Sequence, residues 1–277
     1  MDPLLIFFTP LGVAGAAIAT AASETLSGLI YLRLLVGRKL ANLREIVRIP
    51  SMQSLAPLVI GGATMLGRQI ALNVGFVCAA RRAQSLDRSG VAAAAYGIVM
   101  QLYSIGIVMH VAMQTSAATL VPAIRAKTSD DDAARRVGDR MFTWNTIVGF
   151  GLGSAQFLAL PWIVPLFSTL PEVQQAIRTP ALISSLLLAM NGPVFAGEGI
   201  MLGLGCFRDL MLITSCGIAC MVACLSLPMA KKSVNGILAS FVAFTAFQVL
   251  AVLFHYLKIG PLAIRKSSKR QFQSSKT

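Results

Sequence analysis

The sequence predicts an all-α integral membrane protein with about seven transmembrane helices. Of its 277 residues 56% are hydrophobic and only 13% are charged, whereas soluble domains carry about 25% charged residues. The mean hydropathy is +0.72. The apolar residues form long blocks between short basic loops, and about 20 mostly apolar residues suffice for a helix to cross a bilayer.

Seven apolar blocks define the expected spans, in the order 13–36, 55–80, 91–121, 140–168, 178–205, 208–229 and 234–257. Residues 1–8 have the pattern of the end of a further helix, entered partway through. The chain therefore divides into an amino-terminal part (1–36), a basic linker (37–54), a helical bundle (55–257) and a basic tail (258–277) that we expect to be disordered.

The basic residues indicate how the spans cross the membrane. Most Lys and Arg residues lie in the linker 37–54, the loop 122–139 and the tail 258–277. Basic loops concentrate on the cytoplasmic side of membrane proteins. This rule explains the net charge of +13 better than nucleic-acid binding does. It places the carboxy terminus on the cytoplasmic or organelle-equivalent side. Trp144 and Trp162 suit anchors at the two interfaces of their span.

Two groups of residues that could bind a metal are better explained by structural roles. Ser129 is a candidate N-cap, and the three Asp residues that follow it (130–132) suit the first turn of a helix, where carboxylates offset the helix dipole. Cys216, Cys220 and Cys224 share one helical face without a CxxC pair or a nearby His. Small residues that let helices approach closely explain them better than zinc. We expect no metal site.

Glu198 is the most unusual residue, because it lies within an apolar run, GPVFAGEGIMLGLGCFRD (192–209), among five glycines. Ionisable groups at membrane depth usually face a bundle interior or a cavity. Gly- and Pro-interrupted helices form such sites in transporters. We expect a short gapped helix around 192–206, with Glu198 coupling transport to an ion. The alternative is a protonated Glu that bonds across a helix interface.

Other polar residues within the spans extend this candidate site. Histidine ordinarily titrates near neutral pH, and His110 shares a helical face with Gln114, so it is a second candidate for ion coupling, although a structural role is open. Glu24 and Arg68 allow either a structural salt bridge or transport chemistry. The expected substrate cavity is lined by neutral polar residues and one tyrosine: Tyr96, Gln101, Gln114 and Asn191.

No catalytic motif of soluble enzymes occurs: GxxxxGK[ST], HExxH and GxSxG are all absent. The sequence therefore does not indicate an enzyme. Without an ATP site, transport would need an ion gradient, of H⁺ or Na⁺, and no bound cofactor.

Several motifs in order resemble the MATE multidrug and toxin extrusion transporters. GVAGAAIATAASETLSGLIYL (12–32), preceded by DPLLIF (2–7), looks like the junction of their fifth and sixth helices. GRQIALNVGFVCAARRAQSLDRSGVAAAAYGIVMQLY (67–103) resembles the seventh and eighth. VFAGEGIMLGLGCFRD (194–209) is similar to the tenth-helix pattern F-x-x-D-G-x-x-x-G-x-x-D-F of the DinF-like branch, and HVAMQTSAATLVP (110–122) resembles plant chloroplast members.

The resemblance implies one six-helix lobe plus the preceding helix. MATE transporters have twelve helices in two lobes, so 1–36 would hold the end of one helix and the sixth helix, and 55–257 the carboxy-terminal lobe. Glu198 would replace the family's Asp and keep the carboxylate. Cys206 stands where the family has a second Asp, and Tyr96 where it has a His.

The implied function is antiport: export of an organic solute in exchange for H⁺ or Na⁺, across a plastid or plasma membrane. The implied partners are the solute, the lipid bilayer and a missing amino-terminal lobe. The alternative is a membrane-embedded remnant or assembly subunit that does not transport. A seven-helix receptor fits the span count but lacks a D/E-R-Y motif.

Overall fold

The computed structural model describes residues 12–38 and 51–263. The expected helix end at 1–8, most of the linker 37–54 and most of the tail 258–277 (residues 264–277) lie outside these residues. Within the described ranges every regular element is helical. The all-α fold class is confirmed.

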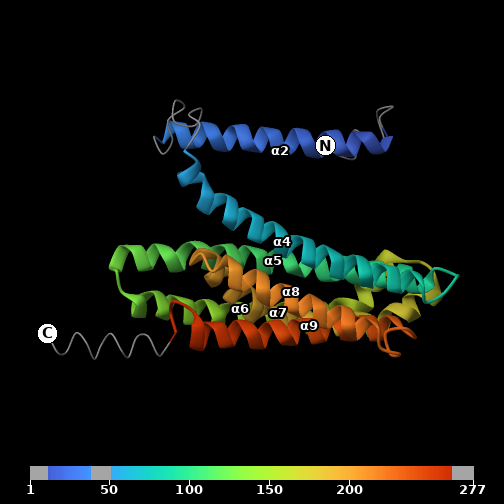
Figure 1. Cartoon of the computed structure of the whole chain (residues 1–277). Helices are drawn as coiled ribbons and strands as arrows, with labels where there is room; N and C mark the ends of the chain where they lie inside the picture. The colour runs from blue at the N-terminus through green and yellow to red at the C-terminus, as the bar shows by residue number, and fades with distance from the viewer. Residues whose placement is uncertain (1–11, 39–50, 264–277) are drawn as a thin grey trace. The chain divides into compact units, whose positions relative to one another are not determined.

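In the described part of the chain, seven long helices lie where the apolar blocks predicted them (Figure 1). They are α2 (Gly12–Gly37), α4 (Met52–Gln84), α5 (Val91–Thr128), α6 (Asp131–Phe167), α7 (Pro171–Gly203), α8 (Phe207–Leu225) and α9 (Val234–Phe254). A π-helical turn, η1 (His255–Ile259), continues α9. Several helices extend beyond the predicted spans, because a helix continues into polar flanking residues that a hydropathy pattern does not assign to the span.

Six of the described helices, α4 to α9, are long and apolar enough to cross a membrane. The seventh expected span, α2, has 26 residues, but the part of it that the structure describes in full is not among them. The chain is therefore a multi-pass membrane protein.

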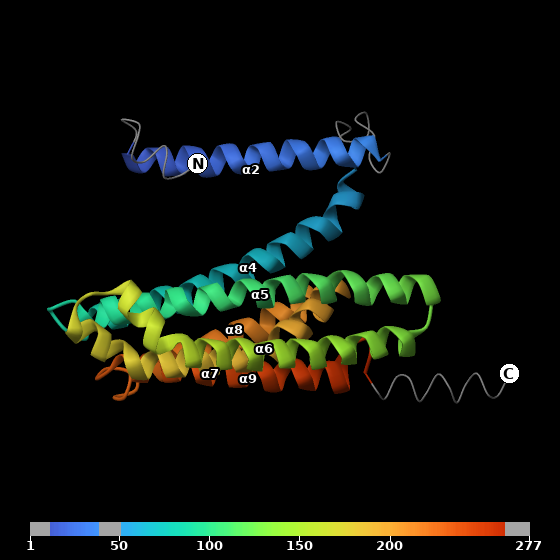
Figure 2. The ribbon, with the colours of Figure 1, turned by 180° about the vertical axis from the view of Figure 1, so that it is seen from behind.

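The chain divides into two compact units, Met1–Leu58 and Val59–Thr277. In the second unit the helices α5 to α9 run alongside one another (Figures 1 and 2). Helix α7 packs against α5, α6, α8 and α9. It is the central helix of this unit, and most of its residues from Ala181 to Met201 are buried.

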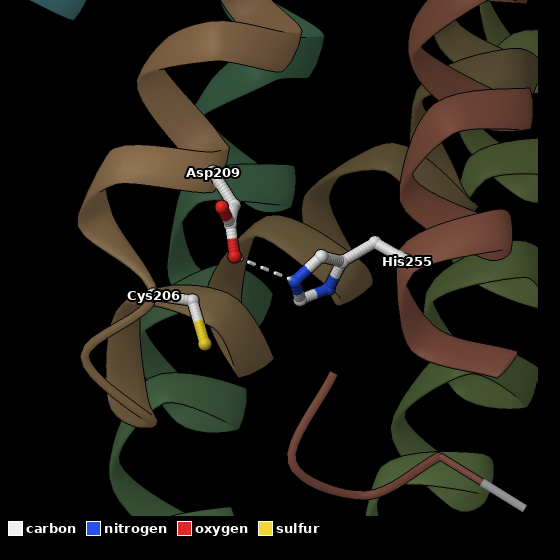
Figure 3. A group of neighbouring side chains, drawn as sticks. All are labelled: Cys206, Asp209 and His255. Atoms are coloured by element: carbon white, nitrogen blue, oxygen red, sulfur yellow. Dashed lines mark hydrogen bonds and ion pairs between the residues drawn. The ribbon is translucent and has the colours of Figure 1, made fainter. Parts of the chain in front are cut away.

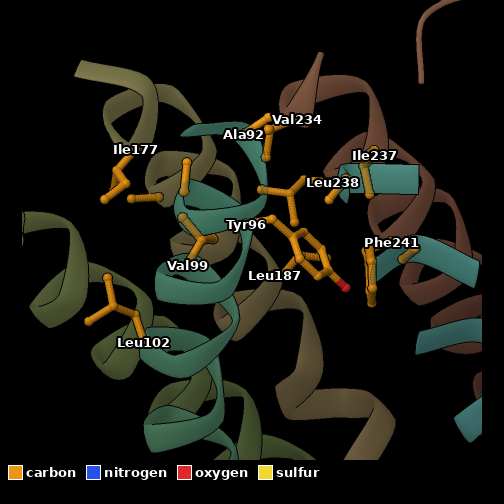
Figure 4. Packing of buried hydrophobic residues seen from close by; sticks show 14 of the residues in the cluster. Ala92, Tyr96, Val99, Leu102, Ile177, Leu187, Val234, Ile237, Leu238 and Phe241 are labelled. Atoms are coloured by element: carbon orange, nitrogen blue, oxygen red, sulfur yellow. The ribbon is translucent and has the colours of Figure 1, made fainter. Parts of the chain in front are cut away.

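A large apolar core joins the six helices α4 to α9 of this unit, and Figure 4 shows part of it. Its fully buried side chains include Val99, Ile177, Leu187, Ile237 and Leu238. Large apolar side chains also lie on the outer surface, such as Leu166 at 83% exposed. Trp144 and Trp162 on α6 are also exposed, as interfacial anchors must be.

The connection between α5 and α6 differs from the prediction in one residue. Ser129 is not the N-cap of α6: it ends α5 in the left-handed conformation, with φ 53°. The cap is Asp130, whose carboxylate accepts a 2.8 Å hydrogen bond from the backbone N–H of Asp132. Two residues thus reverse the chain, one closing a helix and the other opening the next.

Candidate functional site

Glu198 lies at a junction of four helices. Glu198 belongs to α7. Its Oε1 accepts a 2.6 Å hydrogen bond from Nη2 of Arg68 on α4, and the two side chains form an ion pair. Its Oε2 accepts a 2.8 Å hydrogen bond from Nε2 of Gln114 on α5. Nε of Arg68 donates in turn to the hydroxyl of Thr214 on α8, at 3.0 Å. Both carboxylate oxygens therefore have partners, and each comes from a different helix.

The pair is removed from solvent. Glu198 is 3% exposed and the side chain of Arg68 is 16% exposed. A buried charge is tolerated when an opposite charge and hydrogen bonds compensate it. Arg68 supplies the charge, while Gln114 and Thr214 supply further hydrogen bonds. The sequence suggested a salt bridge as one role for Arg68, and the structure identifies its partner.

The glycines beside Glu198 let neighbouring backbones come close. A Cβ at Gly199 would meet the backbone carbonyl of Gln114 on α5, and one at Gly203 that of Ala118. A Cβ at Gly192 would meet the carbonyl of Asn145 on α6. Helix α7 is continuous from Pro171 to Gly203, so no gap interrupts it at Glu198. The expected gapped helix is replaced by a tightly packed one, because the missing side chains make room for α5 and α6.

The break in the helix comes later, at a Schellman motif. Gly205 takes a left-handed conformation, with φ 74°. The N–H of Cys206 bonds to the carbonyl of Met201 at 2.8 Å, and the N–H of Gly205 to that of Leu202 at 3.1 Å. This pattern satisfies the last carbonyls of a helix. The chain then starts α8 at Phe207.

His110 lies on α5 one turn from Gln114 but has its own surroundings. It is fully buried, and its Nε2 lies 3.0 Å from the backbone carbonyl of Leu188 on α7. Its ring stacks on Phe195, with 5.4 Å between centroids. Nδ1 has no hydrogen-bond partner among the described residues. His110 thus binds the same central helix as Glu198 without contacting the carboxylate.

The four expected cavity residues take different positions. Gln114 contacts Glu198, and buried Asn191 donates a 2.7 Å hydrogen bond to the hydroxyl of Tyr103 on α5. Gln101 is exposed on α5. Tyr96 is buried in the apolar core, near Leu187 and Leu238 (Figure 4). The structure therefore brings Gln114 to Glu198 and leaves Tyr96 and Gln101 apart from it.

Sequence reasoning did not connect Thr214 or Tyr103 with this site. Thr214 is an ordinary residue of an apolar span, and Tyr103 follows Gln101 by two positions without a distinguishing pattern. Only the packing of α8 against α4, and of α7 against α5, gives them polar partners.

No protein-family model matches the chain. A curated relative is Protein DETOXIFICATION 45, chloroplastic, of Arabidopsis thaliana, 28% identical over 208 residues, which are 74% of this chain and 35% of that protein. The chain thus spans about a third of the length of the relative it matches.

Solved structures of MATE transporters have the same fold. One from Vibrio cholerae matches with a TM-score of 0.80 and 18% identity, over 94% of this chain and 60% of that one. An outward-facing multidrug resistance MATE family transporter gives 0.79 and 14% identity, over 94% and 59%. A further MATE structure, in a straight conformation, gives 0.77 and 14% identity, over 100% and 60%.

This coverage fits the lobe and preceding helix that the sequence motifs implied. The relatives are transporters rather than enzymes. The resemblance is therefore confirmed: the chain is similar to MATE transporters and has the fold of part of one.

Proposed function

We propose that the chain forms the carboxy-terminal lobe of a secondary active antiporter, which exports an organic solute in exchange for H⁺ or Na⁺. The ion gradient would supply the driving force, without a bound cofactor. A second lobe, from further sequence or from another chain, would complete the transporter. We place it in a plastid or plasma membrane, with the carboxy terminus on the cytoplasmic or stromal side.

The observation that supports this proposal most directly is the environment of Glu198. Its two oxygens hold Arg68 on α4 and Gln114 on α5. Neutralising the carboxylate, with a proton or with Na⁺, would remove the charge that attracts Arg68. Since ionisable groups inside membrane proteins commonly mark ion pathways, loss of this attraction offers a way for ion binding to change how α4 packs against α7.

An efflux assay tests the coupling. We expect inside-out vesicles that contain the chain, with its second lobe, to accumulate ethidium when an H⁺ or Na⁺ gradient is imposed. Glu198→Gln keeps the size of the side chain and one of its two acceptor oxygens but cannot ionise, so gradient-driven accumulation should fall at least about 100-fold, in the range seen when a key ionic or proton-transfer group is lost.

Glu172→Gln is the matched control, since it makes the same change on the same helix at an exposed position in the first turn. It should transport like the wild type. If Glu198→Gln also transports like the wild type, the coupling role of Glu198 is lost.

The same ion pair favours one alternative. Arg68 already compensates Glu198, as in a salt bridge that only fixes helix packing. In that case the chain is a membrane-embedded remnant or assembly subunit without transport activity. Wild-type vesicles that accumulate no ethidium under either gradient, while the protein is folded and inserted, would support this alternative.

A further inference from the structure

Three side chains of metal-binding type converge where α8 begins and α9 ends (Figure 3). Cys206 and Asp209 come from the start of α8, and His255 from the turn that follows α9. One potential ligand atom from each lies within 4.8 Å of the other two. Nε2 of His255 is 3.1 Å from Oδ2 of Asp209. We propose that these residues bind a divalent transition-metal ion, with Zn²⁺ the best fit.

Local structure holds the three groups in place. The Schellman turn at Gly205 puts Cys206 at the N-cap position of α8, and Asp209 follows three residues later on the same side of the helix. His255 begins the π-helical turn η1, and single π turns often occur at functional sites.

His255 has little freedom to move away. It is only 5% exposed, and a Cβ at Gly260 would lie 3.1 Å from its Cε1. The absence of a side chain at Gly260 thus makes room for the ring. The carbonyl of His255 also accepts a 2.7 Å hydrogen bond from the N–H of Gly260, which fixes this turn.

The donor set matches the chemistry of zinc. Zn²⁺ binds thiolate sulfur at about 2.3 Å and imidazole nitrogen or carboxylate oxygen at about 2.0–2.2 Å, with four ligands in a tetrahedron. Such ligand atoms are roughly 3.3–3.7 Å apart, so the three groups need only small side-chain rotations. A thiolate and a carboxylate also balance the +2 charge of the ion, as a site near the membrane requires.

A small cavity beside the cluster offers space for a fourth ligand. It measures about 10 Å³, and Cys206, His255 and Gly260 line it. A cavity of about 10–15 Å³ holds one water molecule. The carboxylate of Asp209 is 48% exposed, which leaves a path for the ion from solvent.

The alternative arrangement of two of the three groups is an ordinary His255–Asp209 ion pair. The metal proposal uses all three and does not depend on transport or on Glu198. It also makes a spectroscopic prediction that an ion pair does not.

Cobalt substitution in the purified full chain, in detergent micelles, tests the site. Co²⁺ should bind at one ion per chain, with a thiolate-to-cobalt charge-transfer band and the visible bands of tetrahedral cobalt, and Zn²⁺ should displace it. Cys206→Ser, Asp209→Asn and His255→Gln should each weaken Co²⁺ binding by about 100-fold or more, beyond the 10–100-fold lost with an outer-shell partner. Cys206→Ser should also abolish the charge-transfer band.

Cys216→Ser is the matched control, because Cys216 is an exposed cysteine on the same helix, and it should bind Co²⁺ like the wild type. In the wild-type chain Zn²⁺ should protect Cys206 from alkylation by iodoacetamide, a readout that needs no variant. The proposal is overturned if Co²⁺ gives no thiolate band. It is also overturned if the band survives Cys206→Ser and disappears in Cys220→Ser, or if Zn²⁺ leaves alkylation of Cys206 unchanged.

Discussion

Arg68 and Glu198 illustrate how a membrane protein keeps two charges inside a helix bundle. Each ion would be costly alone, since desolvation takes several kcal/mol per ion. Together they neutralise one another at 2.6 Å, and Gln114 and Thr214 occupy further hydrogen-bonding positions. Their net contribution to stability is smaller than the cost of breaking the pair, because most of the attraction offsets desolvation.

A double-mutant cycle tests this balance. Arg68→Gln and Glu198→Gln should each lower the free energy of unfolding by about 3 kcal/mol or more, since each leaves the other charge without its partner. The double variant should lose clearly less than the sum. Chemical or thermal unfolding in detergent measures all four proteins.

The control is the more exposed pair Arg125–Asp131, whose side chains are 36% and 21% exposed. Its coupling energy should stay below about 1 kcal/mol. Additive effects of Arg68→Gln and Glu198→Gln would show that the two charges do not depend on one another.

At the scale of the element, α7 is apolar on nearly every face and is buried on most of them. In a membrane the hydrophobic effect does not drive helices together. Close van der Waals packing at small residues holds them together instead. Gly192, Gly199 and Gly203 allow this contact with α5 and α6. The glycines of α7 therefore position the helix that carries Glu198, because they let α5 and α6 approach its backbone.

Replacing Gly199 by Ala should reveal this packing. The new Cβ would meet the backbone carbonyl of Gln114, which cannot move without shifting α5. Unfolding free energy should fall by about 1–3 kcal/mol, as in other overpacked interiors.

Gly151→Ala on α6 should have the opposite sign. A Cβ there meets nothing within 4 Å, so the higher helix propensity of Ala should stabilise the protein by up to about 1 kcal/mol. Equal effects of the two substitutions, measured by thermal unfolding, would contradict the packing role of Gly199.

For the whole molecule, the six long helices α4 to α9 place their connections alternately on two faces. The ends of α5, α7 and α9, at Thr128, Gly203 and Phe254, belong to one face if each helix crosses the bilayer. The basic loop 122–139 predicts that this face is cytoplasmic.

Thiol labelling of a variant without the five native cysteines tests this arrangement. Ser129 and Thr169 are exposed and flank α6, whose 37 residues span about 55 Å. A membrane-impermeant maleimide added to intact cells should label Thr169→Cys, and should label Ser129→Cys only after permeabilisation. Labelling of both from outside would mean that α6 does not cross, and a reversed pattern would invert the orientation.

The sequence alone predicted the helices, since about 20 apolar residues in a row have few other options in water or lipid. It also identified Glu198, because a carboxylate in such a run is rare. It placed the glycines near this residue but misjudged their effect: local composition cannot distinguish a helix gap from a close contact. That distinction depends on whether α5 and α6 lie nearby.

Only the tertiary structure decided which residues meet. Arg68 and Gln114 are 130 and 84 residues from Glu198, and His255 is 46 from Asp209. In a membrane protein apolar side chains face both lipid and core, so hydropathy does not say which way a helix is rotated. For this reason the sequence predicted that Tyr96, Gln101 and Gln114 share one cavity. In the structure Tyr96 lies in the apolar core, Gln101 lies on the surface, and Gln114 contacts the carboxylate of Glu198.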